Sequence, residues 1–451
     1  MKRFAWLFAL AACSSPGQEN RVSYEPLPKP SASPSVDASA DTADPAMSSK
    51  ESKQVARTLE RVTQIRGLKS TKAVPGVKLD RDQLVARVKE KALREYPPEQ
   101  LRREGQLLQI MGFAPTTFDY LGEMMKLLEA QLEGFYEPKN GTMYLASDLR
   151  GDQAKATLAH ELVHALQDQH WDLKTRSQYR PGKGDESMAL ASLAEGDATS
   201  AMLDYILAPA KSALDMPDDM LRELMKSGMN MGDVGSVPHI LKTTLIAPYS
   251  DGLAFVQALR RKGGWAAVDH AWDKMPTTTE QILHVEKWEA GEVAMNVPAP
   301  SAVALGADWK RDDEDSFGEL GFALAFAEWM DGDDARIAAA GWGGDRSAVY
   351  TKGAELAIAV HLRYDPGSSN YADRAIGKLF PAMKKKMGKP AIGEVAVLCF
   401  ERADTGPLYF AKKDRDLVMI VGPAKASGST WTSTSSCAQA RKWGDEVLGQ
   451  K

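Results

Sequence analysis

Two histidines and a glutamate on one short segment are the residues best suited to chemistry. The segment His160-Glu161-Leu162-Val163-His164 has the form HExxH, and the whole chain holds only seven histidines. On a helix, residues four apart stand on the same face, so both imidazoles can reach one ion, while Glu161 lies about 100° further round and can address a water. Two imidazoles leave Zn²⁺ short of its usual ligands, so a third protein ligand and a water would complete a catalytic site.

The third ligand must come from elsewhere in the chain. His170 follows His164 by six residues, but Gln167 stands where an extended HExxHxxGxxH pattern has glycine, so the helix should continue and point His170 away from the ion. Glu195 is the better candidate, because it is a carboxylate on an otherwise apolar helical segment and completes a His₂Glu set. Three other acids compete, of which the first two look like helix caps: Asp185, Glu186 and Asp197.

The elements that must position these residues have clear periodicity. Leucines four residues apart predict a helix over 154–169 with Asp152 as its cap, and an alanine-rich helix is expected over 186–207. Before them, residues 134–145 read as strand, Asn-Gly turn, strand. The second strand, 142–146, directly precedes the predicted active-site helix, so its edge could bind a substrate that pairs with it as an additional strand. A hairpin with a purely structural role is equally compatible with the sequence.

Further elements are predicted on both sides of this segment. Helical periodicity marks 52–66, 81–92, 101–111, 118–132, 252–261, 265–274 and 278–284. Beyond about residue 290 we expect helices over 317–330, 370–386 and 435–448, a hairpin over 348–364, and strands over 394–401, 408–411 and 417–421. The glycine-rich run 341–346 lacks a phosphate-loop pattern and predicts a tight turn with a packed tryptophan.

The chain resembles the gluzincin branch of zinc metallopeptidases, in which HExxH is followed by a glutamate on the next helix. The strings IRGL, GFYEPKNGTMYL, LAHELVHALQDQHWDL, LAEGDAT, TTEQILHVEKW and AAAGWGGDR also look like a family of exported bacterial HExxH proteins, mostly of unknown substrate. This resemblance implies one zinc per chain on His160, His164 and Glu195, with Glu161 as general base. Thermolysin-like enzymes often have an aspartate one turn after the glutamate ligand, where this chain has Thr199.

Because Thr199 replaces that aspartate, the sequence does not identify the residue that orients the metal-binding histidines. Asp168 or Asp197 could orient a histidine, although an exposed helix acid is the commoner explanation of either. The oxyanion of a hydrolytic reaction needs a partner besides zinc, and the candidates are, in order, His284, Tyr249 and Tyr136.

The N-terminus predicts export and lipid attachment. Residues 1–12 have the layout of a signal peptide, and Leu10-Ala11-Ala12-Cys13 resembles the bacterial lipobox, which implies cleavage before Cys13 and its lipidation. Residues 13–53, rich in Ser, Pro, Ala and Asp, predict a disordered tether. The protein is therefore expected in the bacterial cell envelope, attached by acyl chain only, and Ser14 favours the outer membrane.

Composition sets the remaining expectations. With 451 residues and 43% hydrophobic content the chain can bury a core, and its net charge of −5 argues against a nucleic-acid partner. Cys399 and Cys437 could form one disulfide or remain two buried thiols. The predicted fold is α+β: a mostly helical zincin-like catalytic domain over 54–290, with the hairpin before the active-site helix, and a smaller α+β domain over 291–451.

The expected function is zinc-dependent hydrolysis of peptide bonds in a peptide or protein substrate. A non-catalytic lipoprotein on the same scaffold is the alternative, using the metal for stability or the cleft for binding. An enzyme acting on a non-peptide amide or on the cell wall would keep the same residues.

Overall fold

The computed structural model describes residues 47–217, 219–221, 223, 237–367 and 370–450. The predicted signal peptide, Cys13 and most of the tether lie outside the described residues. The first described helix, α2 (Ser49–Arg66), starts inside the predicted tether, because Ser48 and Glu51 form a capping box at its start. The folded chain therefore begins before residue 54.

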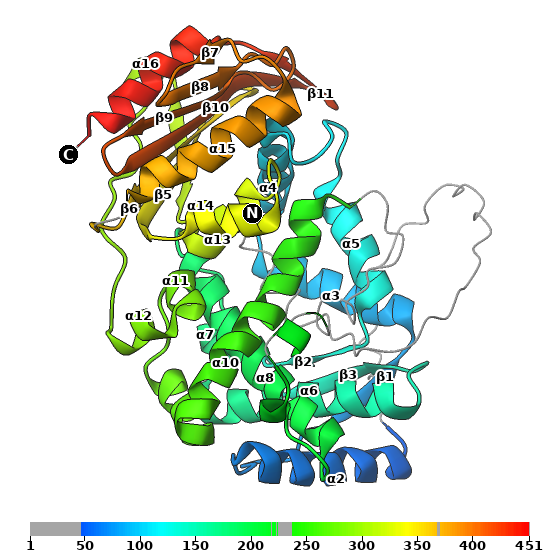
Figure 1. The fold of residues 1–451 in the computed structure, drawn as a ribbon. Helices are drawn as coiled ribbons and strands as arrows, with labels where there is room; N and C mark the ends of the chain where they lie inside the picture. The colour runs from blue at the N-terminus through cyan, green and yellow to red at the C-terminus, as the bar shows by residue number, and fades with distance from the viewer. Residues whose placement is uncertain (1–46, 218, 222, 224–236, 368–369, 451) are drawn as a thin grey trace, which may run out of the picture.

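The N-terminal half is helical, as predicted, and surrounds a small sheet (Figure 1). Helices α3 (Arg81–Glu95), α4 (Pro98–Met111) and α5 (Tyr120–Gln131) match the periodic segments. The hairpin is confirmed as β2 (Gly134–Glu137) and β3 (Thr142–Ala146). A third strand, β1 (Gly76–Leu79), was not predicted and pairs in parallel with β3, so the strand order is β1-β3-β2.

Three long helices form the centre of this half. They are α6 (Gly151–Trp171), α8 (Gly184–Leu207) and α10 (His239–Asp273). Asp152 is not the cap of α6: the N-cap position is Arg150, and Asp152 pairs with Lys155 in solvent. Helix α10 joins two predicted helices across a kink at Gly263 and Gly264 and extends further toward the N-terminus than the periodicity indicated.

Short elements connect the helical half to the C-terminal sheet. They are α11 (Thr279–Leu283), α12 (Val285–Glu289) and η2 (Val303–Leu305), which lie between α10 and the first strand of the sheet. Two other short elements lie within the helical half: α7 (Leu173–Arg176) follows α6, and η1 (Ala213–Asp215) follows α8.

The C-terminal region is an eight-stranded sheet with helices on both faces (Figure 1). Its path is β4-β5-β6-β10-β9-β8-β7, with β11 beside β10. The strands are β4 (Lys310–Asp315), β5 (Trp342–Lys352), β6 (Glu355–Tyr364), β7 (Ile392–Gly393), β8 (Val397–Phe400), β9 (Leu408–Lys413), β10 (Asp416–Ser427) and β11 (Thr430–Ser433). The helices are α13 (Gly318–Phe326), α14 (Gly332–Ala339), α15 (Tyr371–Met387) and α16 (Cys437–Leu448). The glycine-rich run at 341–346 therefore opens a strand, with Trp342 buried, rather than making a tight turn.

Successive side chains along a strand point to opposite faces of the sheet, so each face packs against a different set of helices. On β6, Ala357 and Ala359 pack with α16, whereas Ile358 and Val360 face the core that also contains α13, α14 and α15. That second core continues into the helical half through side chains of α3, α4 and α5, so the two regions share one hydrophobic interior.

A disulfide joins Cys399 on β8 to Cys437 at the start of α16, which settles the pairing that the sequence left open. Among the described helices, none has the length and apolar character needed to span a bilayer.

Candidate metal centre

Helix α6 places His160 and His164 on its interior side. Leu158, Leu162 and Leu166 of the same helix are buried, and α6 packs against α2 and α8. His160, His164 and Glu161 are no more than 2% exposed. Their imidazoles and carboxylate therefore lie inside the protein, where polar groups need partners.

Helix α8 supplies the carboxylate predicted as the third ligand. Glu195 is fully buried, and its Oε2 lies 3.0 Å from His160 Nε2 and 3.5 Å from His164 Nε2. The two Nε2 atoms are 3.0 Å apart. The structure thus brings together the three residues selected from the sequence.

These separations suit one metal ion. Zinc bound tetrahedrally at about 2.0–2.1 Å from each ligand atom keeps the ligand atoms roughly 3.3 Å apart. The second carboxylate oxygen, Glu195 Oε1, is buried and has no hydrogen-bond partner in the structure, so it too could reach an ion. Two imidazole nitrogens and a carboxylate are a donor set that zinc accepts.

The electrostatics of the cluster favour a positive charge between the three groups. Burial by itself lowers the pKa of His164, but the carboxylates of Glu195 and Glu161 outweigh it and raise that pKa to about 9. Burial raises the pKa of Glu195, yet the two histidines bring it below its usual value. A cation at this point would replace the proton shared among these groups.

Helices α8 and α10 approach closely beside Glu195. A Cβ on Gly196 would lie 2.1 Å from the Gly252 carbonyl oxygen, and one on Gly252 would lie 1.9 Å from the Ser192 carbonyl oxygen. Only glycine fits at both positions. This contact also brings Tyr249, one turn earlier on α10, to the cluster, where its ring stacks on His160 with centroids 6.0 Å apart.

The predicted general base is held by the hairpin. The backbone N–H of Tyr136 on β2 donates to Glu161 Oε2 at 2.7 Å, inside the protein. One carboxylate oxygen is thereby fixed, which sets the orientation of Glu161 beside the two histidines.

The side chains of two of the three predicted oxyanion partners bind acids other than Glu161 and Glu195. His284 is 2.8 Å from Glu319, and the pKa of His284 is raised by that hydrogen bond. The hydroxyl of Tyr136 donates to Asp168. Asp168 also accepts the backbone N–H of Lys174, so its hydrogen-bond partners among the described residues are a tyrosine and a backbone amide rather than a histidine.

His284 lies far from Glu195 because the helix that precedes it is bound to the start of α8. Its helix, α11, binds Asp185 through the backbone N–H and hydroxyl of Thr279. Asp185 precedes Glu195 by ten residues, which is about 15 Å along a helix. His284 thus belongs to the junction with the C-terminal region.

The competing ligands have other partners. His170 lies against the Lys69 carbonyl, 2.8 Å from Nε2, and Glu186 pairs with Arg180 and Lys183. Asp185 is buried against Thr279 rather than exposed as a cap.

Sequence reasoning missed the groups behind His164. Gln167 contacts His164 and Asp197, and Asp197 in turn binds Arg66 and the indole N–H of Trp272. The sequence offered Asp197 as a competing ligand or as an acid that could orient a histidine, and the structure connects it to His164 through Gln167. Gln167 itself was noted only as a departure from glycine. A polar side chain three residues after His164, on a helix whose apolar stripe is buried, was the available signal.

The predicted role of 142–146 as a substrate-binding edge is wrong. Strand β3 pairs with β1 on one side and with β2 on the other, so neither edge can accept another strand. The reading of the hairpin as a structural element agrees with the structure, which adds that β2 orients Glu161.

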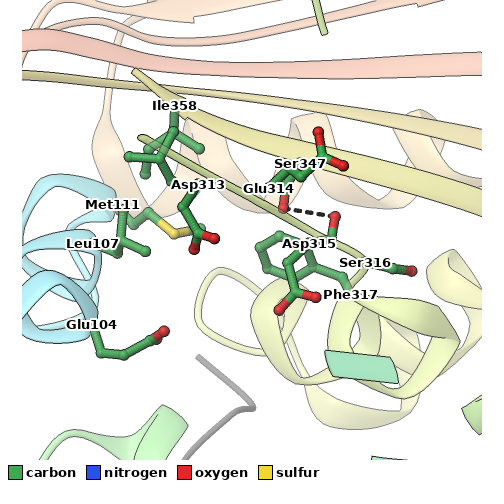
Figure 2. A pocket seen from close by; sticks show the side chains of 11 residues that line it. Glu104, Leu107, Met111, Asp313, Glu314, Asp315, Ser316, Phe317, Ser347 and Ile358 are labelled. Carbon is green, nitrogen blue, oxygen red and sulfur yellow. Dashed lines mark hydrogen bonds between the residues drawn. The ribbon is translucent and has the colours of Figure 1, made fainter. Parts of the chain in front are cut away.

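A cavity lies between α4 and the edge of the C-terminal sheet formed by β4 and β5 (Figure 2). Leu107, Met111 and Ile358 line its apolar side, and Asp313 and Asp315 lie on its polar side. The metal-ligand candidates are not among its lining residues.

Comparison with known proteins adds one finding. A family model described as a domain of unknown function (DUF8575) matches residues 305–429, which covers most of the C-terminal sheet and none of the cluster. No curated protein and no solved structure matches the chain.

Proposed function

We propose that this protein is an exported, lipid-anchored zinc metallopeptidase that hydrolyses peptide bonds. The observation that carries the proposal is the convergence of His160, His164 and Glu195, whose ligand atoms lie 3.0–3.5 Å apart inside the protein, next to Glu161. This is the His₂Glu set of catalytic zinc, with the glutamate of HExxH in the position of a general base.

Each residue has a distinct task in this proposal. His160, His164 and Glu195 hold the metal, which when bound supplies Lewis acidity to activate a water and polarise the scissile carbonyl. Glu161, oriented by the Tyr136 amide, takes a proton from the attacking water and passes it to the leaving amine as the C–N bond breaks. Tyr249, stacked on His160, is the predicted residue best placed to donate to the oxyanion.

The proposed location is the bacterial envelope, with Cys13 as the lipidated residue, and Ser14 favours the outer membrane over the inner one. The disulfide between Cys399 and Cys437 supports an oxidising compartment. The zincin-like identity of the helical half rests on the motif and the ligand geometry.

Burial favours a second candidate function. All three ligand candidates and Glu161 are no more than 2% exposed, as in a zinc site that stabilises a fold. In that alternative the protein is a zinc-containing lipoprotein without catalytic activity.

One comparison separates the two. Zinc content and cleavage of an unfolded protein would be measured for the chain and for Glu161→Gln. A peptidase gives about one zinc in both and cleavage only in the wild type. Zinc in both with cleavage in neither would favour the non-catalytic lipoprotein. Assays with non-peptide amides and cell-wall material would then test whether the protein is an enzyme with such a substrate.

A further inference from the structure

We infer that Gln167 is a positioning residue, which fixes the ring of His164 and ties the two ligand-bearing helices together; this inference rests on the proposed zinc site. Gln167 is fully buried on α6, three residues after His164. Its Oε1 lies 2.8 Å from His164 Nδ1. Its Nε2 donates to the Ala194 carbonyl at 3.0 Å and to Asp197 Oδ2 at 3.1 Å.

The partners settle which way the amide points. A backbone carbonyl only accepts hydrogen bonds, and so does an ionised carboxylate, so the NH₂ group of Gln167 must face Ala194 and Asp197. Its oxygen then faces His164 and can only accept. The proton of the His164 ring is therefore on Nδ1, which leaves Nε2 as the nitrogen available to a metal.

The far end of this connection is fixed by Asp197. Its carboxylate accepts from Arg66 Nε at 2.5 Å and from Trp272 Nε1 at 2.8 Å, and all three side chains are buried. Arg66 ends α2 and Trp272 lies on α10. Four helices thus meet behind His164, and the charge of Asp197 is balanced by Arg66 rather than by the histidine.

Gln167 also acts on the other ligand. The carbonyl it binds belongs to Ala194, the residue directly before Glu195 on α8. One side chain therefore orients the ring of a ligand on α6 and holds the backbone beside a ligand on α8. Thr199, one turn after Glu195, does not supply such a contact, because its hydroxyl is buried and has no hydrogen-bond partner in the part of the chain that the structure describes.

The test measures metal affinity rather than activity. Full-length wild type, Gln167→Met and Gln167→Glu are stripped of metal, and zinc dissociation constants are determined by competition with a chromophoric chelator. Cobalt(II) absorption spectra report the ligand geometry. The matched control is Gln257→Met, because Gln257 is another fully buried glutamine, and its amide has no hydrogen-bond partner among the described residues.

We expect Gln167→Met to bind zinc about 10- to 100-fold more weakly, with an altered cobalt spectrum, and Gln257→Met to match the wild type. Gln167→Glu keeps an oxygen that accepts from Nδ1 but loses the N–H donors to Ala194 and Asp197, so its zinc affinity should fall by less than that of Gln167→Met. A packing role alone predicts the opposite order, since a carboxylate beside Asp197 is harder to bury than a thioether.

Wild-type affinity in Gln167→Met, or equal weakening in both variants, would overturn the inference. If Gln167→Met does not fold, Gln167→Glu decides: a loss of zinc affinity smaller than about 10-fold supports the positioning role, and a larger loss contradicts it. Absence of zinc and cobalt binding in the wild type would instead refute the proposed function.

Discussion

Tyr249 is the residue whose role is tested most simply. Its ring stacks on His160, and it lies on α10 next to the close contact with α8. Tyr249→Phe keeps the ring and removes only the hydroxyl. We expect zinc content to be unchanged and kcat on a peptide substrate to fall by about 100-fold, as for loss of an oxyanion donor.

Tyr364→Phe is the control for this prediction. Tyr364 is also buried, and its hydroxyl donates to the Ala338 carbonyl in the C-terminal region. Its loss should cost about 1 kcal/mol of stability and leave kcat unchanged. Unchanged kcat in Tyr249→Phe would remove Tyr249 from the proposed mechanism.

The sequence predicted the ligand candidates because the position of each along its helix determines which way its side chain points. Two histidines four residues apart must share a helix face, and a lone carboxylate on an apolar helix must be buried with a partner. His284 could not be placed in this way, since its position depends on how α11 meets α8 and the C-terminal region. The role of Gln167 was equally hidden, because its partners Ala194 and Asp197 lie on another helix.

Helices α8 and α10 depend on two facing glycines. A methyl group at Gly252 would overlap the Ser192 carbonyl, and backbone cannot yield as a side chain can. Gly252→Ala should therefore separate the helices, shift Glu195, and cost about 2 kcal/mol or more in the free energy of unfolding. Zinc affinity should fall together with stability, as measured by chemical unfolding and chelator competition.

Gly377→Ala on α15 provides the matched control. Gly377 is an exposed helical glycine, and an added Cβ there would meet no other atom within 4 Å. Helix propensity alone predicts stabilisation by about 1 kcal/mol and no change in zinc affinity. If Gly252→Ala behaved in the same way, the close contact would not determine the geometry of the cluster.

Missed strands account for the main error at the level of elements. Strand β1 has only four residues, too few to show alternation, yet its pairing makes β3 a central strand. Strand β4 has the sequence KRDDED, which lacks the branched and aromatic residues that favour strands. Both are strands because of neighbours that are distant in sequence, namely β3 and β5.

The two halves of the molecule are joined by partly buried polar contacts as well as by a common core. Lys287 on α12 donates to Glu280, Glu292 and Asp365, which come from α11, a connecting loop and the end of β6. One ammonium cannot balance three carboxylates. Burial raises the pKa of Glu280 to about 8, despite the opposing effect of Lys287, so Glu280 retains a proton near neutral pH.

This junction predicts a pH dependence of stability. The usual pKa of Glu280 is 4.5, so between about pH 4.5 and 8 the folded chain holds a proton that the unfolded chain has lost. The free energy of unfolding should therefore fall as the pH rises through this window, by no more than about 1.4 kcal/mol per unit. Glu280→Gln resembles the protonated form at every pH and should be more stable than wild type at pH 8 by about 2 kcal/mol.

Urea unfolding of both proteins at pH 5 and pH 8 checks this expectation. The two should have similar stability at pH 5, where Glu280 is protonated in the folded wild type. A stability difference between variant and wild type that is the same at both pH values would show that Glu280 does not titrate as described.

At the scale of the whole molecule, the sequence predicted the two regions but not that they share one hydrophobic core. The sequence indicated a mostly helical region followed by a smaller α+β region, and the structure agrees, with an eight-stranded sheet in the second region. The shared core and the contacts of Asp185 and Lys287 arise from tertiary packing alone. These contacts also explain why TTEQILH stands out in the sequence, since its Thr279 and Glu280 lie at the junction.

The metal content of the wild type and of Glu195→Ala tests the central claim most directly. Each protein would be purified as the full chain, dialysed against buffer with trace zinc, and analysed for metal per folded chain. The account predicts about one zinc per wild-type chain and loss of most of it in Glu195→Ala, because two imidazoles alone do not hold zinc tightly. Full zinc retention in Glu195→Ala would contradict the ligand assignment, and no zinc in the wild type would remove the basis of the proposed function.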